Sequence, residues 1–554
     1  MLGLSGAAAA AAVLLVTGTV MLRSAPDSRA LGPHEQSPRF ARMQVQETDD
    51  DDGKKRLNTP TSPGVAEIPM DGRRVAPGGH GVVMGDRLGD YGEKDNSISG
   101  ESYARVPQNR FWQVKQQPLS TFSIDVDTAS YANVRRFLLR QSTLPPPDAV
   151  RIEEMINYFD YDYPQPAGPH PFSVSVEQAS CPWSPGHRLV RIGLKGRELQ
   201  RRQRPASNLV FLLDVSGSMS DANKLPLLRQ GLDMMVRQLG ENDRVAIVVY
   251  AGASGMVLPS TACTERNRPQ ILAALERLQA GGSTNGGQGI TLAYQVAVQN
   301  MIRGGVNRVV LATDGDFNVG LTDQQALVKL VQAKARSGVF LSILGLGLGN
   351  LKDSTLEQLA DNGNGNYAYI DTLAEARKVL VQQMSGTLVT IAKDVKIQVE
   401  FNPAQVTFYR LVGYDNRMLA ARDFADDSKD AGEIGAGHTV TALYDVVPVQ
   451  GGRGKLLTVK LRYKKPDEDQ SQLMQHPVTA ESQDLESAST DLRFATAVAW
   501  FGTVLRRAPP ASQAGDALDR VKRLARQSLG PDAHGYRREL VELVQIARRL
   551  QSRR

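Results

Sequence analysis

The stretch Phe-Leu-Leu-Asp-Val-Ser-Gly-Ser-Met-Ser at residues 211–220 carries the strongest indication of the fold. Its apolar residues run up to Asp214, as in a buried strand, and then give way to the polar pattern Asp-x-Ser-x-Ser. The turn therefore offers one carboxylate and two hydroxyls, from Asp214, Ser216 and Ser218. These hard oxygen ligands suit Mg²⁺, Mn²⁺ or Ca²⁺ rather than zinc or copper. Taken singly, the same pattern also occurs in polar turns and helix caps.

Two later segments supply further oxygen ligands. Gly-Gly-Ser-Thr-Asn-Gly-Gly at 281–287 places the hydroxyl of Thr284 in a glycine-rich loop. A second apolar run begins at Arg308 and ends in the carboxylate of Asp314, followed by Asp316. Because chance rarely supplies all three segments in order with strands before them, a metal site is the better interpretation.

Together the three segments resemble the metal-ion-dependent adhesion site of von Willebrand factor type A (VWA) domains. The resemblance implies that Ser216, Ser218 and Thr284 bind a divalent ion directly. It implies that Asp214 and Asp314 hold the waters of the ion or orient its ligands. It also implies an open sixth position, which an Asp or Glu of a protein partner fills. The expected ion is Mg²⁺, with Mn²⁺ or Ca²⁺ as alternatives.

Residues 205–390 are predicted to form this VWA domain, an α/β fold with a central, doubly wound and mostly parallel sheet. The predicted strands are 209–214, 244–250, 308–312, 340–345 and 366–370, with a short edge strand near 256–258. Apolar residues spaced three and four apart from Leu225 to Leu239 indicate a helix that covers the sheet. The three metal-binding loops then lie at one edge of the sheet, where open α/β sheets bind ligands.

Alternating apolar and polar residues predict antiparallel strands on both sides of the VWA domain. These strands are 172–177 and 188–194 before it, and 394–401, 405–411, 439–447 and 456–463 after it. Short sheets without a covered face are marginally stable. We therefore expect the two groups to pair into one β-sandwich, with the VWA domain inserted between its halves. Two independent small β units are the alternative.

The beginning of the chain indicates export. Met1–Leu22 carries no charge and is mostly apolar, and Ser28-Arg-Ala30 has the form of a signal-peptidase site. Residues 1–30 are thus predicted to be a signal peptide, or a membrane anchor, for which the apolar run is long enough. Residues 31–110 are poor in aliphatic residues and predict a disordered linker. The expected location is the periplasm or the cell envelope.

Residues 111–204 resemble the N-terminal VWA-associated domain of a group of bacterial exported proteins. The resemblance rests on Phe-Ser-Ile-Asp-Val-Asp-Thr-Ala-Ser-Tyr at 122–131 and Pro-Pro-Pro-Asp-Ala-Val-Arg-Ile-Glu-Glu at 145–154. Asp125 and Asp127 also suggest a phosphatase of the haloacid dehalogenase type, but that motif requires Thr at position 129, which is Ala. Asp127-Thr128 is instead predicted to cap a helix.

Residues 391–554 are predicted to form a C-terminal β-rich and helical domain of unknown function. Helices are expected at 490–507, 516–527 and 536–550, and the polar stretch 466–486 is expected to be a surface loop. The apolar stripes of these basic helices indicate packing against a core rather than binding to a membrane surface.

Composition excludes some classes of function. The chain of 554 residues is long enough for about three domains, and its net charge of +6 is mild for that length. No basic stripe is interleaved with aromatic residues, so nucleic-acid binding is not expected. The two cysteines, Cys181 and Cys263, are too few for a disulfide scaffold, and their spacing leaves open whether they pair.

The sequence predicts a non-catalytic, metal-dependent module that binds a protein, as in adhesion. It contains no Gly-x-Ser-x-Gly, no Walker loop and no His-Glu-x-x-His. All seven histidines lie outside 205–390, so no imidazole base comes from the VWA domain itself. One alternative is an assembly or scaffold factor of the envelope. A weaker alternative is a Mg²⁺-dependent hydrolase with Asp314 or Asp316 as base.

Overall fold

The computed structural model describes residues 103, 105 and 107–553, with gaps at 125–126, 201–203, 252, 283–286, 316–323, 348–352, 384–387, 430, 453, 467, 480, 482 and 508–510. All described residues belong to a single unit, Gly92–Arg554. The predicted export segment and almost all of the predicted linker lie outside the described residues. The same is true of Thr284, Asp316 and Asp125.

A six-stranded sheet forms the centre of the VWA domain, in the order β10-β9-β8-β5-β6-β7. Its strands are β5 (Ser207–Asp214), β6 (Arg244–Tyr250), β7 (Ser254–Ala262), β8 (Val306–Thr313), β9 (Phe340–Leu346) and β10 (Tyr367–Ile370). The strands are parallel except for β7, which pairs antiparallel with β6 at the edge. All eight residues of β5 are buried, as expected for a central strand covered on both faces.

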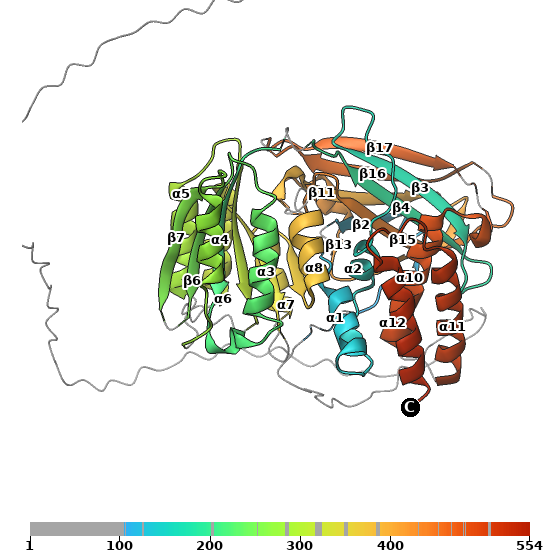
Figure 1. The fold of residues 1–554 in the computed structure, drawn as a ribbon. Helices are drawn as coiled ribbons and strands as arrows, with labels where there is room; N and C mark the ends of the chain where they lie inside the picture. The colour runs from blue at the N-terminus through green and yellow to red at the C-terminus, as the bar shows by residue number, and fades with distance from the viewer. Residues whose placement is uncertain are drawn as a thin grey trace, which may run out of the picture. The chain divides into compact units, whose positions relative to one another are not determined.

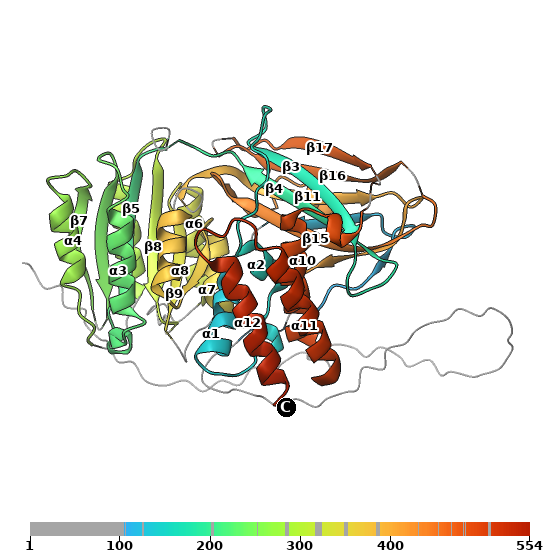
Figure 2. The ribbon, with the colours of Figure 1, turned by 45° about the vertical axis from the view of Figure 1, so that its right-hand side comes forward.

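Helices cover both faces of this sheet, which confirms the doubly wound arrangement (Figures 1 and 2). One face packs against α3 (Leu225–Val236), α4 (Arg268–Glu276), α8 (Leu373–Arg377) and a π-helix (Lys378–Gln382). The other face packs against α5 (Gly287–Gln299), α6 (Gln324–Arg336) and α7 (Asp353–Asn362).

Two further sheets form a sandwich around one hydrophobic core. The first has the order β1-β12-β15-β4-β3, with β1 (Trp112–Gln113), β12 (Val406–Val412), β15 (Thr439–Pro448), β4 (Arg188–Gly196) and β3 (Phe172–Ser180). The second has the order β13-β2-β11-β16-β17, with β13 (Met418–Leu419), β2 (Leu119–Ser123), β11 (Thr390–Phe401), β16 (Lys455–Lys464) and β17 (Gln472–Thr479). The short strand β14 (Ile434–Gly435) pairs with β11.

Each sheet of the sandwich contains strands from before and from after the VWA domain. In the first sheet, β4 pairs with β15, and in the second, β2 pairs with β11. The prediction of an inserted VWA domain is therefore confirmed, and the alternative of two independent β units is wrong.

Five helices form a separate core beside the sandwich. They are α1 (Ala129–Leu139), α2 (Ile152–Asn157), α10 (Thr490–Arg507), α11 (Ala511–Gln527) and α12 (Tyr536–Gln551). The helices α10, α11 and α12 lie side by side in both views (Figures 1 and 2), and the apolar stripes of the predicted C-terminal helices pack inward. Within the described part of the chain, no helix combines the length and hydropathy needed to cross a bilayer.

Buried arginines of the flanking segments bind acidic residues of the VWA domain. Arg135 of α1 donates to Asp371 and Glu375, at the start of α8. Arg151, immediately before α2, donates to Asp353, the first residue of α7, at 2.6 Å. The VWA domain is thus joined to its flanks by buried, paired charges.

The structure corrects the prediction that 466–486 is a loop. Residues 472–479 form β17, the edge strand of the second sheet. Only Met474 and Val478 pack against the sandwich core, and Pro477 is exposed. With so few apolar residues facing the core, the sequence of β17 shows no clear alternation of apolar and polar residues. Proline is tolerated in β17 because it is an edge strand.

Thr128 takes the N-cap position of α1, as predicted, but the expected side-chain cap does not form. Thr128 makes no capping hydrogen bond with its side chain. The carboxylate of Asp127 instead accepts hydrogen bonds from the backbone N–H of Tyr367 at 2.8 Å and from Arg417 at 3.4 Å. Asp127 therefore joins the N-terminal segment to the VWA sheet and to the sandwich.

Cys181 and Cys263 are both buried and free, so they do not pair in this structure. Burial raises the pKa of the two thiols to about 12 and about 11. Neither cysteine therefore has the lowered pKa of a reactive thiol.

Candidate metal-binding site

The first predicted metal-binding residue ends β5. Asp214 is fully buried, and its Oδ1 accepts a hydrogen bond from the backbone N–H of Ser216 at 2.9 Å. Its Oδ2 accepts from the hydroxyl of Thr313 at 3.3 Å. Burial raises the pKa of Asp214, and the nearby charge of Asp314 raises it further, although the hydrogen bonds from Ser216 oppose the shift. Both oxygens of Asp214 are thus oriented by protein donors.

The two serine hydroxyls of this loop converge. The chain leaves β5 through a 3-10 turn over Gly217–Ser220, and the Oγ atoms of Ser216 and Ser218 are 3.0 Å apart. Ser216 is buried and Ser218 is exposed. Hydroxyl oxygens this close on one turn can both bind a single ion.

The second loop is hydrogen-bonded to the first. The backbone N–H of Gly217 donates to the carbonyl of Gly282 at 3.1 Å, and that of Gly281 donates to the carbonyl of Val215 at 2.7 Å. Thr284 lies outside the described residues. The chain immediately before it is therefore fixed against the Asp-x-Ser-x-Ser turn by two backbone hydrogen bonds.

The chain after Thr284 is also fixed. The first turn of α5 lies so close to the sheet that a Cβ atom on Gly289 would be 2.9 Å from Cβ of Tyr250. Glycine at this position permits the close approach of helix and sheet.

The third predicted segment places a carboxylate next to the first. Asp314 follows β8, which pairs in parallel with β5, and the side chain is almost completely buried. Its Oδ2 accepts a hydrogen bond from the ammonium of Lys224 at 3.0 Å. Its Oδ1 is buried and has no hydrogen-bond partner among the residues that the structure describes.

Lys224 is the residue that the sequence did not single out. A lysine just before a helix is usually a solvated residue, and no pattern links it to Asp314. Only the neighbouring positions of β5 and β8 in the sheet bring the two together. A lysine shortly after the Asp-x-Ser-x-Ser turn was the one available signal.

The side chains present fit a hard divalent cation. The donors are carboxylate and hydroxyl oxygens, which Mg²⁺, Mn²⁺ and Ca²⁺ prefer. A buried carboxylate oxygen without a partner is rare, and at Asp314 a bound ion or its water would satisfy it. Within the described ranges no group of three or more His, Cys, Asp and Glu side chains could hold a metal, so the site depends on its hydroxyls.

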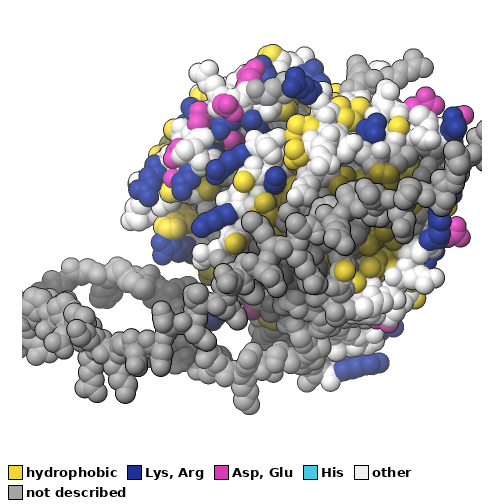
Figure 3. Space-filling model, turned by 90° about the vertical axis from the view of Figure 1, so that its left-hand side faces the viewer, with side chains coloured by type: hydrophobic (Ala, Val, Ile, Leu, Met, Phe, Trp, Pro, Cys, Tyr) yellow, Lys and Arg dark blue, Asp and Glu magenta, His cyan; other side chains and the backbone are white. Residues whose placement is uncertain are grey.

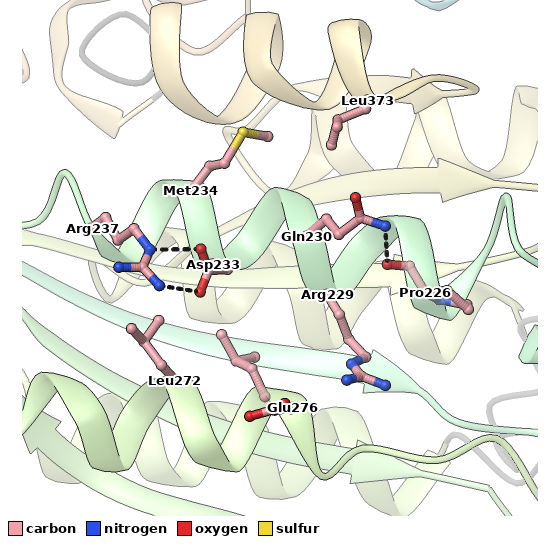
Figure 4. Close-up of a pocket in the computed structure, with 10 residues that line it drawn as sticks. Pro226, Arg229, Gln230, Asp233, Met234, Arg237, Leu272, Glu276 and Leu373 are labelled. Atoms are coloured by element: carbon pink, nitrogen blue, oxygen red, sulfur yellow. Dashed lines mark hydrogen bonds and ion pairs between the residues drawn. The ribbon is translucent and has the colours of Figure 1, made fainter.

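A groove of about 650 Å³ lies on another part of the VWA domain, between α3 and α4 (Figure 4). Its charged residues include Asp233 and Arg237, which form an ion pair, and Leu373 of α8 lies at its rim. None of the described candidate metal ligands lines this groove. Its lining also contains no serine, cysteine or histidine that could serve as a nucleophile or base.

Histidines of the described residues form contacts outside the VWA domain. His187 bonds to Asp445 at 2.7 Å, and His170 bonds to the hydroxyl of Tyr463 at 2.8 Å. These contacts lie within the sandwich. They do not supply a base to the Asp-x-Ser-x-Ser turn.

Charge on the face of the molecule in Figure 3 is mixed. Lys and Arg side chains are interspersed with hydrophobic and acidic ones, and they do not form one basic stripe. The described side chains visible on that face form no continuous positive surface of the kind that follows a nucleic-acid backbone.

A six-stranded, doubly wound sheet with an Asp-x-Ser-x-Ser turn at the end of its central strand defines a VWA-domain protein. The model of the von Willebrand factor type A domain matches residues 208–383. A model described as von Willebrand factor matches residues 97–191, and one described as the C-terminal part of the uncharacterized protein YfbK matches 386–550.

The chain belongs to the family of the uncharacterized protein YfbK of Escherichia coli (strain K12), to which it is 43% identical over 472 residues, 80% of each chain. It is also 29% identical over 209 residues to the uncharacterized protein sll0103 of Synechocystis sp., covering 37% of this chain and 48% of that protein. Among solved structures, a von Willebrand factor type A protein from Catenulispora acidiphila matches 78% of this chain and 88% of its own, at 15% identity and a TM-score of 0.40.

The family models and the YfbK relative identify the protein as a bacterial VWA-domain protein with a C-terminal domain of the YfbK type. VWA domains generally act as interaction or adhesion modules rather than as enzymes, and they typically bind a divalent metal. The VWA domain therefore suggests a protein-interaction or adhesion module.

Proposed function

We propose that this protein binds a protein partner through a divalent metal ion held by Asp214, Ser216, Ser218, Thr284 and Asp314. The hydroxyls would bind the ion, and the two aspartates would orient the ligands or hold the waters of the ion. When bound, the ion supplies a positive centre that an Asp or Glu of the partner can fill. Mg²⁺ is the proposed ion, with Mn²⁺ and Ca²⁺ as alternatives.

One observation carries the proposal. Asp314 places a buried oxygen without a described partner at the same sheet edge as the paired hydroxyls of Ser216 and Ser218. The backbone bonds of Gly217 and Gly281 hold the glycine-rich loop against that edge. The described parts of three segments distant in sequence therefore lie together, which supports the proposal of a single ion bound between them.

We further propose that the protein works at the cell envelope. Support comes from the uncharged, apolar segment Met1–Leu22 and the signal-peptidase pattern at Ser28–Ala30. Cleavage would release the chain to the periplasm, and retention would anchor it in the membrane. A scaffold or assembly factor of the envelope is the second candidate, and it differs in needing no metal for its contacts.

Calorimetry with Mg²⁺ and Mn²⁺ tests the metal site. The wild type should bind one ion, and the double variant Ser216→Ala/Ser218→Ala should lose that binding. Ser220→Ala is the matched control, because Ser220 is an exposed serine of the same turn outside the Asp-x-Ser-x-Ser pattern. Equal binding heats for the double variant and the wild type would rule out the proposed ligands.

Crosslinking on cell envelopes with mass spectrometry tests the partner. A partner captured by the wild type should disappear with EDTA and with Thr284→Ala, and the loss of affinity should be about tenfold or more. A partner retained by Thr284→Ala at saturating Mg²⁺ would favour the metal-independent scaffold. Hydrolysis of phosphate esters by the wild type, lost in Asp314→Ala, would favour the hydrolase instead.

A further inference from the structure

Lys224 joins two of the metal-binding segments through its side chain. It lies directly before α3, and only 6% of its surface is exposed. Its ammonium donates to the carbonyl of Ser218 at 2.9 Å and to Oδ2 of Asp314 at 3.0 Å. A further carboxylate oxygen, of the exposed Asp221, is 3.7 Å away. A buried positive charge is therefore part of the site.

The aliphatic part of Lys224 is held in a slot that glycine leaves open. Gly347, after β9, has a φ of +82°, and a Cβ atom there would be 2.3 Å from Cε of Lys224. The carbonyl of Gly347 in turn accepts a hydrogen bond from the hydroxyl of Tyr369. Residues from three segments therefore fix the position of the ammonium.

The buried ammonium of Lys224 changes the net charge of the site to which a metal ion would bind. Among the buried side chains, the carboxylates of Asp214 and Asp314, when both are charged, and the ammonium of Lys224 sum to a single net negative charge, whereas water screens the exposed carboxylate of Asp221. A divalent ion then gives the site a net positive charge of one. Without Lys224, the same ion would only neutralise the two carboxylates.

We propose that Lys224 is a built-in cation of the metal site with two effects. It holds Asp314 in place when no metal is bound, and it keeps the metal-loaded site positive, so that an anionic partner group is favoured. The inference rests on the proposed function. In this role, Lys224 weakens the binding of the metal ion alone and strengthens the capture of a partner carboxylate by the bound ion.

The test compares Lys224→Met with the matched control Lys329→Met, at an exposed lysine of α6. Calorimetry of the full chain measures the affinity for Mn²⁺ alone, and then the affinity for Mn²⁺ in the presence of glutarate, which serves as a carboxylate probe. Because a repelling charge is removed, Lys224→Met should bind Mn²⁺ about tenfold more tightly. The gain in Mn²⁺ affinity that glutarate gives the wild type should fall about tenfold. Lys329→Met should match the wild type in both.

Opposite changes in the two quantities separate this role from a merely structural one. If Lys224 only supported the fold, its loss would weaken Mn²⁺ binding, and that result would overturn the inference. Tighter Mn²⁺ binding with an unchanged glutarate effect would overturn it as well. A wild type that binds no Mn²⁺ would overturn both this inference and the proposed function.

Thermal unfolding provides a second measurement. In EDTA, Lys224→Met should unfold several degrees below the wild type, because two buried carboxylates lose their cation. Saturating Mn²⁺ should remove that difference, since the ion replaces the lost charge. A deficit that persists in Mn²⁺ would contradict the inference. If Lys224→Met does not fold, Lys224→Gln serves, because it keeps a donor without the charge.

Discussion

At the residue scale, the two aspartates of the site differ in their surroundings. Both oxygens of Asp214 accept hydrogen bonds from protein donors, whereas Asp314 keeps one buried oxygen without a described partner. Asp214 therefore shapes the first loop, and Asp314 is the carboxylate with an oxygen left for the ion or its water.

Asp314→Asn should weaken metal binding by about 10–100-fold, the range for losing a group that supports a metal ligand. Asparagine has nearly the same shape, so the sheet should remain intact, and calorimetry and circular dichroism measure the two effects. Binding within about twofold of the wild type would show that Asp314 does not face the ion.

Lys378 should make the stability of the protein depend on pH. This lysine of the π-helix is buried over the ring of Tyr158, and burial lowers its pKa to about 8. Below pH 8, Lys378 is protonated in both the folded and the unfolded protein. Between pH 8 and its ordinary pKa of about 10.4, Lys378 is protonated only in the unfolded protein. Stability should therefore rise with pH in that window, by on the order of 1 kcal/mol between pH 7.5 and 9.5.

Lys378→Met should lack this contribution. Urea unfolding at the two pH values, compared between variant and wild type, isolates it from other titrating groups. The same pH dependence in both proteins would mean that Lys378 keeps its ordinary pKa when folded.

The site shows how far single residues can be read from a sequence. Asp214, Ser216 and Ser218 were predictable, because a local pattern ends a recognisable strand. Lys224 was not, because its contact with Asp314 exists only once β5 and β8 lie side by side. The long-range contacts of Asp127 were missed for the same reason, since its partners lie far along the chain.

At the element scale, α7 and α8 are held by arginines of the flanking segments. Arg135 bonds to Asp371 and Glu375, and its side chain is only 3% exposed. Removing one partner of a buried charge network leaves the others uncompensated, which costs about 3–5 kcal/mol.

Arg135→Met should therefore lower the free energy of unfolding by about 3–5 kcal/mol in urea titrations. Arg237→Met is the control, because Arg237 also pairs with an acid, Asp233, but its side chain is 58% exposed. The control should unfold at nearly the same urea concentration as the wild type, because exposed ion pairs contribute little to stability. Equal losses in the two variants would show that burial of the network is unimportant for stability.

Helices and strands were predictable from the sequence where the pattern of apolar residues was strong. The helix 490–507 and the strand 244–250 have the predicted bounds, because each has a long apolar face or run. The edge strand β17 was missed, since half of its residues are polar and only Met474 and Val478 pack against the core. The edge strand β7 was predicted too short, because only 256–258 form an apolar run and the strand otherwise contains Ser, Gly, Pro, Thr and Ala.

At the scale of the whole molecule, the fold depends on strands from both ends of the insertion. The strand β11 lies between β2 and β16, and β15 lies between β4 and β12. The apolar core of α10, α11 and α12 also includes residues of α1 and α2. The sequence indicated the pairing only through an argument about stability, because the pattern within a strand does not show which distant strand it pairs with.

The two ends of the insertion lie close together. A Cβ atom on Gly196, the last residue of β4, would be 3.0 Å from Cδ1 of Ile391, the second residue of β11. A chain that joins 107–200 directly to 388–554 through a short Gly/Ser linker can therefore form both sheets of the sandwich without the VWA domain.

We expect residues 391–554 alone not to unfold cooperatively, because β11 and β15 would each lack a neighbouring strand and the helical core would lack α1 and α2. The linked chain should unfold in one cooperative transition, though at a lower temperature than the full chain, since Arg135, Arg151 and Arg417 lose their acidic partners in the VWA domain. Circular dichroism and chemical denaturation of the two proteins measure this. Cooperative unfolding of 391–554 on its own would show that the strands before the VWA domain are dispensable, and that the sandwich does not require both halves.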